Sequence, residues 1–231
     1  MLKVQAKPID FKFNEYISKG VDLLKKDFGN VFLAFFFCIV MSIIPFCSFL
    51  AVGNFYKYCR RLNKRQQASP GDIFNFDDFT PYFILQLILI GGIFLLYIPM
   101  FIMIPVLTGE NGEPSTAFFA FFIPYLVILS LAILIITLKG FYIPALISFG
   151  GIKEVKTAWN MSVIMGKNNL LSIFLFSLVI SIIGQLGILL CGIGIFFTLP
   201  LVYTAHYFAY EDAMQQIEYD EIKEIGSKNE Y

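Results

Sequence analysis

The residues that could carry chemistry are few, and the only histidine, His206, lies in an apolar stretch between Tyr203 and Tyr207. A lone imidazole in such a stretch can relay a proton or bind a ligand, but it more often forms a hydrogen bond within a helical bundle. With one histidine, the sequence contains neither a histidine-rich iron site nor an H-E-x-x-H zinc motif. We therefore expect no metal and no cofactor.

Three aspartates in the segment SPGDIFNFDDF, Asp72, Asp77 and Asp78, could form a carboxylate metal site. A structural role explains the pattern better. Ser69 is a favourable helix N-cap, Pro70 suits the first turn, and Asp72 completes an S-x-x-D capping box. The segment predicts a short surface helix that leads into the next apolar block.

Polar residues within or near the apolar blocks are the remaining candidates. Asn54, Gln86, Gln185 and His206 would line a path in a transporter, whereas in a structural bundle they would bond neighbouring helices. Apart from Glu211 at the inner end of the last one, the predicted spans contain no acidic residue, and ion-coupled transporters usually keep one within the membrane. We treat these four as weak candidates for polar contacts inside the membrane. No nucleophile paired with a base is evident, so we do not expect an enzyme.

Composition shows which elements must position these residues. Of the 231 residues, 58% are hydrophobic and 15% are charged, whereas about a quarter of a soluble domain is charged. The apolar residues form uncharged blocks at 31–53, 79–109, 114–138, 140–150 and 170–210. Such blocks favour membrane-spanning helices, so we predict an all-α, polytopic helical bundle in a lipid bilayer. A net charge of zero gives no indication of a nucleic-acid partner.

Lysines and arginines orient the bundle because basic residues near span ends stay in the cytosol. They are frequent both before residue 30 and after residue 56, so the block between them must cross and return as a hairpin that breaks at Pro45. The last block is too long for one crossing, and Gly184 and Gly187 offer a turn. The predicted spans are 30–46, 48–64, 82–106, 117–139, 169–186 and 189–211.

This topology puts both termini in the cytosol and 16 of the 17 basic residues on the cytosolic side. It divides the chain into a cytosolic arm (1–29), a six-helix membrane domain (30–213) and an acidic cytosolic tail (214–231). The arm ends in a predicted amphipathic helix with Tyr16, Leu23 and Leu24 on one face. That helix would lie on the bilayer surface or pack on the cytosolic ends of the spans, and the sequence does not decide between these alternatives.

The two predicted hairpins resemble each other. A shift of 139 residues aligns Asn30–Pro45 with Asn169–Gly184, and seven of 16 positions are identical. An amphipathic stretch precedes each segment. The pattern favours a parallel internal repeat, because the copies would enter the membrane in the same direction. Some transporters contain parallel repeats, but a plain duplication would produce the same pattern.

Several segments in order, KKDFGN, RLNKRQQASPGDIFNFDDF, GIKEVKTAWNMSVIMGKNN and GQLGILLCGIGIFFTLPLVYTAHYFAYED, resemble a group of poorly characterised bacterial multi-pass membrane proteins. The group includes the membrane domain of some glycerophosphodiester phosphodiesterases. The resemblance covers most of residues 12–213 and implies a six-helix membrane domain in the bacterial cytoplasmic membrane. It implies no phosphodiesterase activity, since the matching segments contain no catalytic domain. We expect a structural subunit that interacts with another membrane protein, with a small-solute or lipid transporter as the alternative.

Overall fold

The computed structural model describes residues 7–108, 115–189 and 194–228, and these form helices without any strand. One short 3-10 helix, η1 (Pro70–Phe74), accompanies the α-helices. The α-helices are α1 (Phe13–Lys26), α2 (Phe28–Ile43), α3 (Ser48–Asn63), α4 (Phe79–Leu107), α5 (Thr116–Lys139), α6 (Ile143–Ser148), α7 (Val155–Gly166), α8 (Leu170–Leu189) and α9 (Ile195–Lys228).

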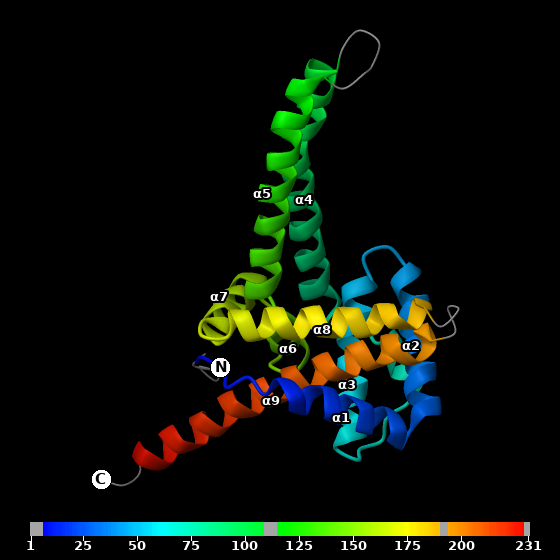
Figure 1. Cartoon of the computed structure of the whole chain (residues 1–231). Coiled ribbons are helices and arrows are strands. Elements are labelled where there is room, and N and C mark those ends of the chain that lie inside the picture. Colours follow the sequence, from blue (N-terminus) through cyan, green and yellow to red (C-terminus); the bar gives the residue numbers. More distant parts are fainter. Residues whose placement is uncertain (1–6, 109–114, 190–193, 229–231) are drawn as a thin grey trace.

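A long hairpin of α4 and α5 projects from a body that the other helices form (Figure 1). In the body, α8 and α9 run side by side across the direction of the hairpin, and α1 lies along α9 (Figure 1). The helices α2 and α3 pack against each other and against η1. The hairpin therefore touches the body only near its base, where α4 and α5 meet α3, α7 and α8.

Three described segments are long and apolar enough to cross a membrane: Phe79–Ile104, Phe118–Ser148 and Leu170–Leu189. A fourth candidate is the pair α1 and α2, which is bent by 105° between the helices. The chain is therefore an all-α membrane protein, as the sequence predicted. Six crossings stay a prediction. Helices α2 and α3 have 16 residues each and are therefore about 24 Å long. This is shorter than the hydrocarbon core of a bilayer, which is about 30 Å thick.

The predicted break at Pro45 is confirmed, since α2 ends at Ile43 and α3 begins at Ser48. The predicted turn at Gly184 and Gly187 is wrong, because α8 continues through both residues to Leu189. These glycines instead let α9 approach α8. A Cβ atom on Gly187 would lie 2.2 Å from the Thr198 Oγ1, and that hydroxyl donates a 3.0 Å hydrogen bond to the Gly184 carbonyl. The glycines are contact positions between helices rather than a turn.

The amphipathic helix of the N-terminal arm packs on the last helix. Tyr16 is buried and its hydroxyl donates a 2.7 Å hydrogen bond to Asp212. A Cβ atom on Gly20 would lie 3.0 Å from the backbone nitrogen of Ala205, so α1 and α9 are nearly in backbone contact. Of the two alternatives left open by the sequence, this geometry fits packing on the bundle. The order α1–α2–α3 is repeated by α7–α8–α9, but the duplication itself stays a prediction.

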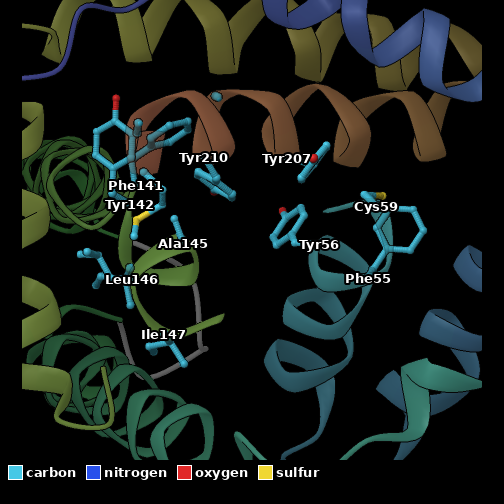
Figure 2. Packing of buried hydrophobic residues seen from close by; sticks show 14 of the residues in the cluster. Phe55, Tyr56, Cys59, Phe141, Tyr142, Ala145, Leu146, Ile147, Tyr207 and Tyr210 are labelled. Atoms are coloured by element: carbon cyan, nitrogen blue, oxygen red, sulfur yellow. The ribbon is translucent and has the colours of Figure 1, made fainter. Parts of the chain in front are cut away.

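An aromatic core lies where α3, α9 and the segment around α6 converge (Figure 2). Tyr56 of α3 meets Tyr210 of α9 edge to face, with ring centroids 5.1 Å apart. Phe141, which precedes α6, contacts Tyr210 at 5.2 Å. Edge-to-face ring pairs stabilise a core beyond the area that they bury. This core fixes the position of α3, whose last two turns carry most of the charged contacts described below.

Candidate functional site

Asn54 ties α3 to the η1 segment. Its side chain is buried in α3 and donates hydrogen bonds of 2.8 Å and 2.6 Å to the carbonyl oxygens of Ile73 and Asn75. Both acceptors lie at the end of η1, so one amide group holds the whole η1 segment against α3. Buried polar groups need such partners because an unpaired one is costly.

The other three predicted polar residues have separate surroundings. Gln86 of α4 accepts a long 3.4 Å hydrogen bond from Ser48, and Gln185 is exposed on α8. His206 donates from Nδ1 to the Val202 carbonyl at 2.7 Å within its own helix. Its ring packs against Phe176 with centroids 5.2 Å apart. The structure therefore does not bring Asn54, Gln86, Gln185 and His206 into one site.

The predicted capping box is confirmed at the start of η1. The Asp72 carboxylate accepts a 3.1 Å hydrogen bond from the Ser69 backbone, and it also pairs with Arg61 at 2.8 Å. Asp77 is exposed and accepts a hydrogen bond from Asn75. Within the described part of the chain, no three His, Cys, Asp or Glu side chains are placed to hold a metal ion.

The most developed polar site is an ion-pair network around the end of α3, which we call the α3 network. Glu211 of α9, whose side chain is 3% exposed, lies 2.8 Å from Arg60 and 3.2 Å from Lys64. Asp78, at the start of α4, pairs with Lys57 and with Lys153, the latter at 2.5 Å. The network consists of Lys57, Arg60, Arg61, Lys64, Asp72, Asp78, Lys153 and Glu211.

The α3 network joins five segments: α3, η1, the start of α4, the loop before α7 and α9. The basic half of the network is visible in the sequence, where one helix face carries basic residues at the spacing i, i+3, i+4, i+7: Lys57, Arg60, Arg61 and Lys64. From the sequence alone, these residues served only to orient the chain. Their acidic partners come from other segments, so the pairing could not be derived from local spacing.

Asp78 gives the network a dependence on pH. Burial alone would raise the pKa of Asp78, but hydrogen bonds and charge from Lys153 and Lys57 outweigh it and lower the pKa below 3.8. A group with a lowered folded-state pKa stabilises the fold above its unfolded-state pKa of about 4, and this stabilisation is lost as pH falls further. We predict that Asp78→Asn flattens the decline in melting temperature between about pH 4 and pH 2.5.

The melting temperature of detergent-solubilised protein across that pH range measures this effect. Asp77→Asn is the matched control, because the Asp77 side chain is exposed and among the described contacts bonds only to Asn75, while the backbone carbonyl that accepts from Lys153 is unchanged by the substitution. Equal acid sensitivity of wild type and Asp78→Asn would contradict the role assigned to the Asp78 carboxylate.

Comparison with protein-family models, with curated proteins and with solved structures finds no match to this chain. The resemblance to the membrane domain of glycerophosphodiester phosphodiesterases therefore stays a prediction.

Proposed function

We propose that this chain is a non-enzymatic component of the bacterial cytoplasmic membrane that binds another membrane protein through the α4–α5 hairpin. The main supporting observation is the exposure of the hairpin. We compare the most apolar 18 residues of each candidate span. In the two hairpin segments, Phe79–Ile104 and Phe118–Ser148, 0% and 6% of these residues are buried, whereas 28% are buried in Leu170–Leu189. Outside its base, the hairpin surface is left to lipid or to helices of another protein.

Two adjacent glycines in α4 favour a partner helix. Gly91 and Gly92 lie mid-helix, and a Cβ atom added at either would meet no atom within 4 Å. Glycine inside a helix costs about 0.5–1 kcal/mol relative to alanine, and no described residue of this chain uses the space that these two leave. Small residues on a membrane helix allow another helix to approach closely. A partner helix seated there explains the glycines, whereas lipid gains nothing from them.

The test is purification from native membranes in a mild detergent, with co-purifying proteins quantified by mass spectrometry. We expect a stoichiometric membrane protein with wild type, and at least about a tenfold loss of it with Gly92→Leu, since a clash between helices costs more than 1.4 kcal/mol. Ala120→Leu, at an exposed position of α5, adds similar bulk to the other helix of the hairpin as a control. An unchanged melting temperature for both variants shows that the fold is intact. Equal recovery of the partner with both variants would contradict the proposal, as would the absence of any partner.

The second candidate function, a protein that moves lipid, is supported by an apolar groove at the base of the hairpin. The groove has a volume of about 540 Å³ between α3, α4, α5 and α7, and Leu85, Ile88 and Ile136 are among its apolar lining residues. Lys156 and Trp159 of α7 also line it, and these are residue types that suit the level of the lipid headgroups. An acyl chain would fit such a groove. Co-purification of a phospholipid without a protein partner would favour this second function.

A further inference from the structure

A second concave surface, distinct from the hairpin, opens beside the end of α3. This basic pocket has a volume of about 490 Å³. Four of its lining residues are the basic side chains of the α3 network on α3, and two others come from the end of α6: Lys57, Arg60, Arg61, Lys64, Ser148 and Phe149. The described lining includes no carboxylate.

Two carboxylates of the network are buried and hold cations of the pocket in place, and the third, Asp72, is 36% exposed and pairs with Arg61. Glu211 and Asp78 have side chains only 3% and 6% exposed, whereas those of Arg61 and Lys64 are 46% and 41% exposed. Each of the two buried carboxylates is shared by two basic side chains. Lys57, Arg60 and Lys64 are thus held by the buried carboxylates, while parts of the Arg61 and Lys64 side chains stay accessible.

Arg60 is fixed a second time from the α6 side. Its guanidinium carbon lies 4.7 Å from the centre of the Phe149 ring, a cation–π contact. Ser148, next to it, shares a 2.6 Å hydrogen bond with the Tyr82 hydroxyl, which ties this wall of the pocket to α4. Both walls are therefore held in place without a ligand, and preorganisation of this kind lowers the cost of binding.

The chemistry of the pocket selects its ligand class. A guanidinium group donates two parallel hydrogen bonds to two oxygens of a phosphate, and an ammonium group adds a positive point charge. Phe74 lines a neighbouring hollow together with Arg61, and Phe74 and Phe76 are 40% and 52% exposed. Exposed aromatic residues are typical of the membrane interface. We propose that the basic pocket binds a phosphate-bearing anion at the cytosolic surface of the membrane.

The test titrates purified protein in an uncharged detergent with three probes: phosphatidylglycerol, phosphatidylcholine with the same acyl chains, and inorganic phosphate. Native mass spectrometry detects bound lipid, and the melting temperature detects bound phosphate. If the ligand is a lipid headgroup, phosphatidylglycerol binds more tightly than phosphatidylcholine and inorganic phosphate does not displace it. If the ligand is a free phosphate compound, inorganic phosphate stabilises the protein and displaces phosphatidylglycerol. Both results support the pocket and distinguish the source of the anion.

Variants place the binding in the pocket. We expect Lys64→Gln and Arg61→Gln each to weaken binding of the anion by about tenfold, since a charge-assisted hydrogen bond contributes about 1.4 kcal/mol or more. Lys167→Gln, an exposed lysine outside the lining, should leave binding unchanged. Lys64→Gln leaves Arg60 as a partner for Glu211, so this variant should fold even if others do not. Equal binding of both lipids without any effect of phosphate would overturn the proposal, and so would equal affinities of Lys64→Gln and Lys167→Gln.

The pocket does not depend on the proposed function, because it lies on α3 and α6, whereas the proposed partner surface lies on α4. Gly92→Leu should remove the partner protein and keep the anion, and Lys64→Gln should do the reverse. Failure of one proposal can therefore be recognised while the other is supported.

Discussion

Replacing Glu211 with glutamine should lower the free energy of unfolding by about 3 kcal/mol, at the low end of the range for breaking a buried ion pair. The Glu211 side chain is 3% exposed and faces both Arg60 and Lys64. The neutral amide keeps the size of the side chain but removes the charge that balances two cations. We chose the low end because the partner side chains are 21% and 41% exposed, so water recovers part of the lost interaction.

The measurement is reversible unfolding in mixed micelles, followed by circular dichroism, with the midpoint compared between variants. Glu15→Gln is the matched control, since Glu15 forms an exposed pair with Lys19 at 2.9 Å and should change stability by less than about 0.5 kcal/mol. If Glu211→Gln and Glu15→Gln unfold at the same midpoint, then the α3 network does not hold α9 on α3.

The sequence predicted the elements well where a local rule decides them. The capping box at Ser69 depends on a spacing of three residues, and the break at Pro45 depends on a missing backbone donor. The long apolar blocks required helices because backbone polar groups have no other partner in lipid. Such rules need no knowledge of the rest of the chain.

Contacts between distant segments were not predictable in the same way. Gly187 has the composition signal of a turn, and only the approach of Thr198 reveals it as a contact position. Glu211 is the last residue of a predicted span, and only the structure shows that it is buried against α3. Asn54 was one of four polar residues that could have lined a path, and its acceptors at Ile73 and Asn75 lie about 20 residues away. In each case the partner comes from another element, and a single sequence does not show that pairing.

Asn54 also distinguishes the structural interpretation from a path for solutes. We expect Asn54→Leu to lower the free energy of unfolding by about 2–4 kcal/mol, because the buried contact to the Ile73 carbonyl contributes about 1–3 kcal/mol and the partly buried contact to the Asn75 carbonyl about 1 kcal/mol. The segment η1 should then separate from α3 more often and be cut faster by a protease added to the solubilised protein. Unfolding midpoints in mixed micelles and the rate of cleavage near Pro70 measure the two effects.

Asn30→Leu is the control, since Asn30 is exposed and bonds only to the Asp27 side chain among the described contacts. A residue that lined a path would behave differently: its replacement by leucine would leave stability unchanged or improved, because an unpaired amide in an apolar bundle is a cost that leucine removes. A loss of stability with faster cleavage near η1 therefore supports the tie between α3 and η1. Unchanged stability of Asn54→Leu would instead return Asn54 to the set of possible path residues and would strengthen the case for transport.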